Sequence, residues 1–101
     1  MKYKVIVRPE AEDNLKEAFS WYEDKRTGLG YDVLLQVDVG INFINRNPEI
    51  HPIEYKGTRK HVIKRFPYKI IYLVEGEKII ILAVIHGKRR PDLIKKIIES
   101  I

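Results

Sequence analysis

The stretch Gly57–Pro91, with the sequence GTRKHVIKRFPYKIIYLVEGEKIIILAVIHGKRRP, decides the fold of this chain. It contains apolar runs with the character of β-strands at residues 59–66, 69–75 and 78–86. Pro67 separates the first run from the second, and a tight turn with Gly76 at its bend separates the second from the third. The third run is apolar on both faces, which indicates a central strand covered above and below. The stretch therefore predicts a three-stranded meander.

The residues before this stretch predict a cover for one face of the meander. Lys2–Val7 alternates and indicates a short, half-buried strand. Pro9 suits the first position of a helix, which we expect to end where Gly28 and Gly30 break it. A second helix is predicted over Tyr31–Arg46 from its apolar stripe. Because the connecting loop is short, the two helices should form an antiparallel hairpin.

A last helix is predicted after the meander, since Pro91 suits a first helical position. Its apolar stripe consists of Ile94, Ile97, Ile98 and Ile101. The strand at residues 2–7 has no neighbouring strand in sequence, so we expect it to join the meander. The predicted fold is a single α+β domain over residues 1–101. In it, the N-terminal strand and helical hairpin pack on one face of a four-stranded, mostly antiparallel sheet.

Composition excludes several classes of site. The chain has no cysteine, which excludes disulfides, zinc thiolate sites and thiol nucleophiles and suits a reducing cytoplasm. His51, His61 and His86 are scattered without the spacing of metal ligands, so we expect no metal and no cofactor. No apolar run approaches the roughly 20 residues that a membrane helix needs. We therefore expect a cytoplasmic protein without a membrane segment.

Charge is distributed unevenly along the chain. Residues 1–55 contain 7 Lys/Arg and 10 Asp/Glu, a net charge of −3, whereas residues 56–101 contain 12 Lys/Arg and 4 Asp/Glu, a net charge of +8. This asymmetry favours an anionic partner for the C-terminal half, either nucleic acid or an acidic protein. The alternative is a solvated basic surface that serves solubility.

The excess cations fall in two groups. These are Arg59, Lys60, Lys64 and Arg65 on the first meander strand, and His86, Lys88, Arg89 and Arg90 at the end of the central strand. Alternation places Arg65 on the face of Ile63 and Lys64 on the face of Phe66. If the two groups lie close together, they can bind phosphates, or cleave RNA without metal with His86 as acid or base. The residue type alone favours a simpler role for His86, which is to close the sheet.

Two motifs in the stretch resemble those of a known family. KRFPYKIIY at residues 64–72 resembles the "R-F-P-Y-x-I-x-Y" strand pair, and AVIHGKRRP at residues 83–91 resembles the "H-G-x-R-x-P" strand end, of toxins of the RelE/ParE superfamily. The N-terminal strand and the helical hairpin that ends near Asn47-Pro48 also fit this superfamily. The resemblance covers essentially the whole chain.

The resemblance implies a toxin of a type II toxin–antitoxin system that is neutralised by a cognate antitoxin with an acidic tail. RelE-like members cleave mRNA in the ribosomal A site without metal, and ParE-like members inhibit DNA gyrase. The motif wording is closer to the ParE-like branch, and no tyrosine follows Tyr72, whereas RelE-like toxins commonly have one in the C-terminal segment. The first hypothesis is a gyrase inhibitor of the plasmid-stabilisation type. The alternatives are a ribosome-dependent endoribonuclease and a non-toxic antitoxin-binding module.

Each hypothesis assigns site residues. A gyrase inhibitor would contact its target through Arg59, Lys60, Arg65, Lys88, Arg89 and Arg90. A ribonuclease would use Lys64, Arg65, His86 and Arg89 on the ribosome and its mRNA. The antitoxin is expected to bind the isoleucine stripe at Ile94, Ile97, Ile98 and Ile101.

Overall fold

The computed structural model describes residues 3–88 and 91–99. Its elements in chain order are β1 (Lys4–Val7), α1 (Pro9–Lys25), α2 (Leu29–Arg46), the 3-10 turn η1 (Tyr55–Gly57), β2 (Arg59–Val62), β3 (Tyr68–Glu75), β4 (Lys78–His86) and α3 (Pro91–Glu99). This order confirms the predicted α+β fold. Lys2 lies outside the described residues, and Tyr3 precedes β1 rather than belonging to it.

The four strands form one sheet in the order β1-β4-β3-β2. The β2–β3 and β3–β4 pairs are antiparallel, and β1 pairs in parallel with β4. Tyr68 pairs with His86 at one end of the β3–β4 hairpin, and Glu75 pairs with Lys78 at the turn. Gly76 in that turn has φ +60°, a value that glycine adopts without strain. The N-terminal strand therefore joins the meander beside its central strand, as predicted.

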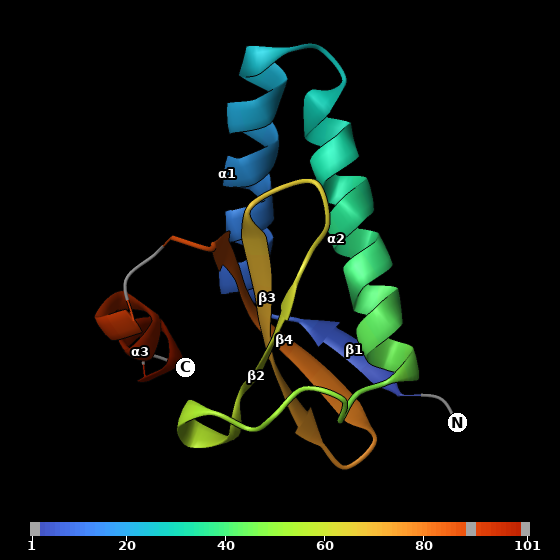
Figure 1. Cartoon of the computed structure of the whole chain (residues 1–101), viewed down its shortest axis with the longest axis vertical. Coiled ribbons are helices and arrows are strands. Elements are labelled where there is room, and N and C mark those ends of the chain that lie inside the picture. The colour runs from blue at the N-terminus through green and yellow to red at the C-terminus, as the bar shows by residue number, and fades with distance from the viewer. Residues whose placement is uncertain (1–2, 89–90, 100–101) are drawn as a thin grey trace.

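Helices cover both faces of this sheet (Figure 1). Side chains of α1 and α2, among them Ala11 and Val37, share a core with Ile70, Tyr72 and Ile81. On the other face, Ile98 of α3 packs with the sheet residues Ile71, Leu82, Ala83 and Ile85. β4 contributes to both cores, which confirms the prediction that this strand is covered above and below.

The loop between α1 and α2 differs from the prediction. Gly30 does not break a helix but lies inside α2, which begins at Leu29. A side chain at this position would meet Phe19, since a Cβ built there comes within 2.7 Å of both its ring and its carbonyl oxygen. The carboxylate of Glu23 accepts the N–H groups of Gly28 and Gly30 at 2.9 Å each. Glycine therefore serves the close approach of the two helices, and Glu23 satisfies the first N–H groups of α2.

β2 ends at Val62, so it is shorter than the strand predicted at residues 59–66. Arg65 has φ +72°, a left-handed conformation that costs a non-glycine residue about 1 kcal/mol. This turn reorients the side chains that follow it. Ile63 and Phe66, predicted on opposite faces, are both buried in the core beneath the helical hairpin. The alternation rule fails here because it holds only for extended backbone.

Among the described residues, no helix is both long enough and apolar enough to cross a membrane.

Candidate functional site

The turn that contains Lys64 and Arg65 lies beside the end of β4. The N–H of Gly87, just after β4, donates a hydrogen bond to the carbonyl of Pro67 at 2.6 Å. Pro67 lies in the connection between β2 and β3, which also contains Lys64 and Arg65. The antiparallel β3–β4 pairing thus places the end of β4 beside the turn that carries two of the predicted site residues.

His86 is held by its neighbours at this edge. Its ring contacts the Tyr68 ring edge-on, with centroids 5.5 Å apart. Its Nδ1 accepts the backbone N–H of Lys88 at 3.1 Å. This hydrogen bond occupies the lone pair of Nδ1, so that nitrogen does not act as a base in this arrangement. The contacts are those of a histidine that closes the end of a strand.

A cleft of about 290 Å³ opens between α1 and the end of β4. Its lining includes Glu17, Trp21, Tyr68 and His86. Trp21 is 55% exposed, which is unusual for the only tryptophan of the chain. Asn14 lines the same cleft, and its Oδ1 accepts the N–H of Val84 at 2.9 Å. The sequence analysis missed this cleft, although a tryptophan among the charged residues of α1 was a signal for it.

Arg65 points toward α2, away from this cleft. Its guanidinium lies 3.7 Å from the carboxylate of Asp32 and 5.2 Å from the centre of the Phe66 ring. Both partners of the ion pair are largely exposed, so the pair orients the side chain more than it stabilises the fold. Arg65 is therefore an accessible cation held in a defined direction.

A row of aromatic rings connects Arg65 with His86. Phe66 contacts Tyr22 at 5.1 Å, Tyr22 contacts Tyr68 at 6.1 Å, and Tyr68 contacts His86. Edge-to-face contacts of this kind fix ring orientation and contribute roughly 1 kcal/mol each. The row gives this edge of the molecule a rigid apolar base beneath its cations.

Lys64 lines a groove of about 350 Å³ between α2 and β2. Phe43, Arg46 and His61 line the same groove. Lys64 lies close enough to His61 that its charge helps to lower the pKa of that histidine. The described members of the predicted ribonuclease set thus have different neighbours. Lys64 lines the groove between α2 and β2, Arg65 pairs with Asp32, and His86 lines the cleft beside α1.

The predicted target-binding cations are also divided. Arg59 donates to the carbonyls of Glu49 and His51, so it holds the loop that follows α2. Lys60, the next residue on the strand, lies on the opposite face and pairs with Glu54 at 3.4 Å. Lys88 is exposed, and Arg89 and Arg90 lie outside the described residues. Among the residues that the structure describes, Arg59, Lys60 and Lys88 therefore lie in different surroundings.

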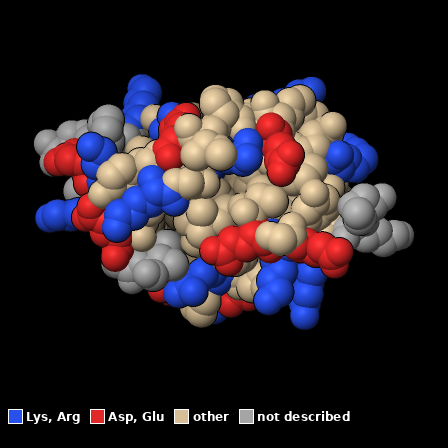
Figure 2. Space-filling model, turned by 90° about the horizontal axis from the view of Figure 1, so that it is seen from below, with Lys and Arg blue, Asp and Glu red and all other residues tan. Residues whose placement is uncertain are grey.

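The surface shows the same division of charge. On the side seen in Figure 2, lysines and arginines alternate with acidic residues around an uncharged centre. The asymmetry of charge along the sequence therefore does not appear as one continuous positive patch on this side.

The isoleucine stripe of α3 is turned toward the sheet. Ile98 is only 9% exposed, and Ile94 and Ile97 pack partly buried beside it. The hydroxyl of Tyr55 donates to the carboxylate of Glu99 and ties α3 to η1. Ile101 lies outside the described residues. An antitoxin that contacts this stripe would have to compete with the sheet for it.

A metal site is not built by the described residues, since no three of their His, Asp or Glu side chains are grouped to hold an ion. The nearest arrangement is a pair of rings. Nε2 of His51 lies 2.9 Å from Nδ1 of His61, within hydrogen-bond distance, and His61 stacks on Phe43 at 4.9 Å. Such a pair shares a proton between the two rings, and so it links two segments of the fold.

A family model described as ParE toxin of type II toxin-antitoxin system, parDE, matches residues 5–91. The chain belongs to this family of ParE toxins. The matched range includes both motif runs, at residues 64–72 and 83–91, and confirms the predicted resemblance. Membership implies a type II toxin–antitoxin system and an antitoxin as partner. No curated protein sequence matches the chain significantly.

Solved structures of both superfamily branches share the fold. A chain of the chromosomal ParDE TA system from P. aeruginosa has a TM-score of 0.76 at 16% identity, covering 86% of this chain and 98% of that chain. A mutant of the E. coli toxin RelE in the free state has a TM-score of 0.72 at 15% identity, covering 100% of this chain and 99% of that chain. At such low identity these similarities concern the fold alone.

Proposed function

We propose that this ParE-family chain is an active cytoplasmic toxin that arrests growth by binding and inhibiting DNA gyrase, and that a cognate antitoxin with an acidic tail neutralises it. The observation that carries the proposal is the match to the ParE family model over residues 5–91. A protein inhibitor needs an accessible, rigid contact surface rather than a set of converging catalytic groups.

The edge where β4 ends supports a protein contact. Trp21 is exposed there beside Tyr68 and His86, and the aromatic row beneath them is rigid. Tryptophan, tyrosine and arginine are the residues that contribute most to protein–protein binding. We assign the target contact to this edge and to the adjoining turn, with Lys88 and Arg65 as the cations that the structure describes. Arg89 and Arg90 lie outside the described residues and belong to the same hypothesis.

The endoribonuclease remains the second candidate, because the chain shares its fold with RelE as well as with the ParDE chain. Metal-independent cleavage of RNA needs a base, an acid and a cation around one phosphate. Lys64, Arg65 and His86 contact different neighbours in the described structure, and Nδ1 of His86 already accepts a hydrogen bond. This arrangement supports the gyrase inhibitor over the ribonuclease.

Expression of the chain in bacteria tests the proposal. We expect growth arrest with a DNA-damage response and intact mRNA, and inhibition of supercoiling when the purified chain is added to purified gyrase. Cleaved mRNA on translating ribosomes, with supercoiling unchanged, would establish the ribonuclease instead. Absence of toxicity with retained antitoxin binding would establish the non-toxic binding module.

A pair of variants tests the contact surface. Arg65→Asn removes the cation, while asparagine tolerates the left-handed backbone at this position. We expect the concentration needed to inhibit gyrase to rise about tenfold, as for loss of one charged contact at an interface. Lys78→Ala removes an exposed cation at the other end of β4 and serves as the matched control. Equal inhibition by both variants, with unchanged circular dichroism, would refute the assignment of Arg65.

A further inference from the structure

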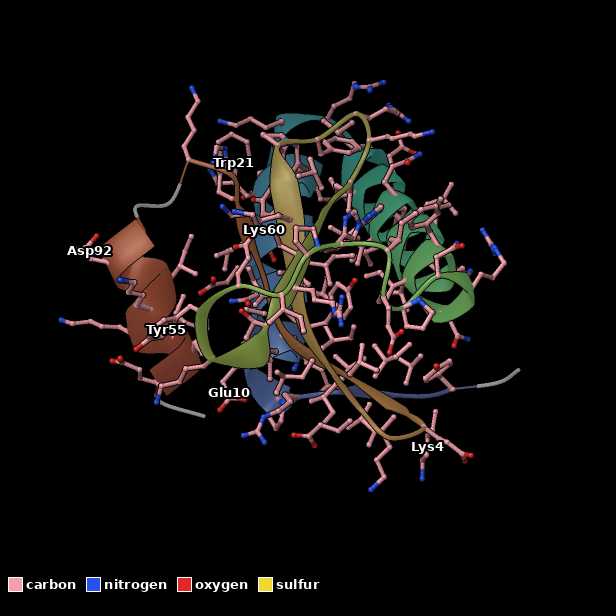
Figure 3. All side chains as sticks on the ribbon, turned by 60° about the horizontal axis from the view of Figure 1, so that its bottom comes forward. Lys4, Glu10, Trp21, Tyr55, Lys60 and Asp92 are labelled. Atoms are coloured by element: carbon pink, nitrogen blue, oxygen red, sulfur yellow. The ribbon has the colours of Figure 1, made fainter. Side chains whose placement is uncertain are left out.

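The cleft between α1 and the end of β4 combines aromatic rings with a carboxylate. Asn14, Glu17 and Trp21 line it from α1, and their spacing of three and four residues places them on one side of the helix. Tyr68 of β3 and His86 of β4, which pair with each other in the sheet, line the cleft as well. Figure 3 shows Trp21 next to the end of β4. The cleft is therefore bounded by a helix on one side and by a strand pair on the other.

The aromatic rings around the cleft face in different directions. The Tyr22 ring lies at interplanar angles of 76° to Trp21 and 63° to Tyr68. The Tyr68 ring lies at 66° to the His86 ring. All four of these side chains line the cleft. Rings at such angles form walls that are not parallel, which is the arrangement of an aromatic cage that binds organic cations through the negative faces of its rings.

The charge of the lining also favours a cation. Glu17 provides a carboxylate, and none of the described residues that line the cleft is a lysine or an arginine. Glu17 forms no ion pair within the described part of the chain. His86 is uncharged in this arrangement, because its Nδ1 accepts the N–H of Lys88, whereas both ring nitrogens donate in a charged histidine. The Glu17 carboxylate is therefore available to a positively charged ligand.

Trp21 already contacts one cation from its own helix. The ammonium group of Lys25 lies 4.3 Å from the centre of the indole ring, which is within the range of a cation–π interaction. Lys25 is not among the residues that line the cleft. The indole is thus a cation acceptor, and the part of it that lines the cleft is left for another group.

We propose that this cleft binds an arginine side chain of the target protein. The guanidinium group stacks on Trp21 and donates to the Glu17 carboxylate, while Tyr68 flanks it from the sheet. Arg65 and Lys88 do not line the cleft, so they make other contacts of the same interface. The inference rests on the proposed function, which places the target contact at this edge, and it names the chemical group that the target supplies.

Other occupants fit the cleft less well. The planar guanidinium of arginine can stack on a ring and donate two hydrogen bonds to a carboxylate, whereas the ammonium group of lysine can do neither in this way. Nucleic acid would place its phosphates beside the Glu17 carboxylate, where the described lining offers no lysine or arginine to bind them.

Tryptophan fluorescence of the full chain tests the cleft, since Trp21 is the only tryptophan. The probe is the blocked tripeptide acetyl-Gly-Arg-Gly-amide, and its control has citrulline, an uncharged isostere, in place of arginine. We expect the arginine tripeptide to change the Trp21 emission until it saturates, and added salt to weaken this binding. The citrulline tripeptide should bind about fivefold more weakly, the size of one exposed cation–π contact.

Glu17→Gln and Glu12→Gln are a matched pair of variants in α1. Glu17→Gln keeps the size of the side chain but removes its charge, so it should weaken binding of the arginine tripeptide about threefold, as for an exposed ion pair. Glu12→Gln makes the same chemical change five residues away on another side of the helix, outside the lining of the cleft. It should leave binding unchanged.

Other outcomes would overturn the proposal. Equal binding of the citrulline tripeptide would reduce the cleft to a surface without preference for charge, and equal weakening by Glu12→Gln would reduce the effect to general acidic charge. Equal binding of acetyl-Gly-Lys-Gly-amide would refute the assignment to arginine. Tighter binding of choline than of the arginine tripeptide would identify a free organic cation, and not a side chain of the target, as the occupant.

Inhibition of supercoiling by purified gyrase is measured in parallel to separate the two proposals. If the chain binds the arginine tripeptide but does not inhibit gyrase, the proposed target fails and the arginine site stands. If the chain inhibits gyrase but its Trp21 emission responds to neither tripeptide, the arginine site fails and gyrase inhibition stands.

Discussion

His61 links three segments of the chain through one ring. It belongs to β2, its ring stacks on Phe43 of α2, and its Nδ1 faces Nε2 of His51 in the loop after α2. Gly40 makes room for it, because a Cβ at that position would lie 3.2 Å from the His61 ring. Burial lowers the pKa of His61, and the neighbouring His51 and Lys64 lower it further.

This environment predicts that the protein loses stability in mild acid. The pKa of His61 is lower in the folded chain than its ordinary value of 6.5, so the unfolded chain binds more protons between these two values. Stability should therefore fall as pH decreases below about 6.5 and level off below the folded pKa. Arg46 and Arg59 also lie near this ring pair. Urea denaturation at pH 7.5 and pH 5.5 measures the effect.

His61→Phe is the matched variant, since it keeps a ring against Phe43 but cannot titrate. Its stability should depend less steeply on pH than that of the wild-type chain over the same range. An unchanged slope in the variant would show that His61 does not contribute to the acid sensitivity.

At the scale of single residues, the sequence predicts burial better than conformation. Ala11 and Ala18 of α1 and most of the apolar run of β4 are buried. Gly30 was wrongly predicted to break a helix, because its role depends on the approach of Phe19 from another element. Arg65 pairs with Asp32, which is distant in sequence, and Lys60 pairs with Glu54 across a turn. No local sequence pattern therefore identifies either ion pair.

α3 depends on the rest of the molecule for its structure. A helix of nine residues is too short to be stable alone in water. It is held by Ile98 in the second core, by the Tyr55–Glu99 hydrogen bond and by the contact of Lys95 with the Tyr55 ring. The stability of α3 should therefore depend on its contacts with the sheet and with Tyr55, and not on the core beneath α1 and α2.

Ile98→Ala should release this helix while the sheet stays folded. Removing a buried isoleucine side chain costs about 2 kcal/mol or more, which corresponds to roughly thirtyfold faster amide hydrogen exchange in α3. Lys96→Ala changes an exposed position of the same helix and should leave exchange unaltered. Faster exchange throughout β3 and β4 in the Ile98 variant would contradict independent docking.

At the scale of elements, sequence patterns predicted the α-helices and β-strands of the described residues in the right order, but not the 3-10 turn η1. The exceptions are boundaries: α2 begins earlier than Tyr31, and β2 ends before Phe66. The candidate site was predicted less completely. The two motif runs meet where the N–H of Gly87 bonds to the carbonyl of Pro67, but the cleft beside Trp21 and the groove beside Lys64 are formed by side chains from separate elements. Such places depend on tertiary packing rather than on sequence period.

The whole molecule is organised around a strand near the end of the chain. β4 lies between β1 and β3, contributes to both cores and carries the apolar run at residues 79–85. Its partner β1 comes from the first residues of the chain, so the sheet closes through a contact between distant segments. Contacts of this kind must overcome a large loop entropy before they stabilise the fold.

A chain shortened to residues 1–77 should therefore show no cooperative unfolding transition, because it lacks the centre of the sheet, part of the core beneath α1 and α2 and most of the core beneath α3. A chain of residues 8–101 loses only the edge strand β1 and should keep a cooperative transition at lower stability. Thermal unfolding followed by circular dichroism distinguishes the two. A cooperative transition in the 1–77 chain would show that the helical hairpin and β2–β3 form a core of their own.

The position of β4 also has a consequence during synthesis of the protein. A ribosome makes the two long helices first and residues 78–86 among the last. Until that strand leaves the ribosome, α1 and α2 lack the surface that covers their apolar sides, and β1 lacks its partner. For a member of a toxin family, this order delays folding until β4 has been made. Products of premature termination would therefore be unfolded, and harmless to the cell that makes them.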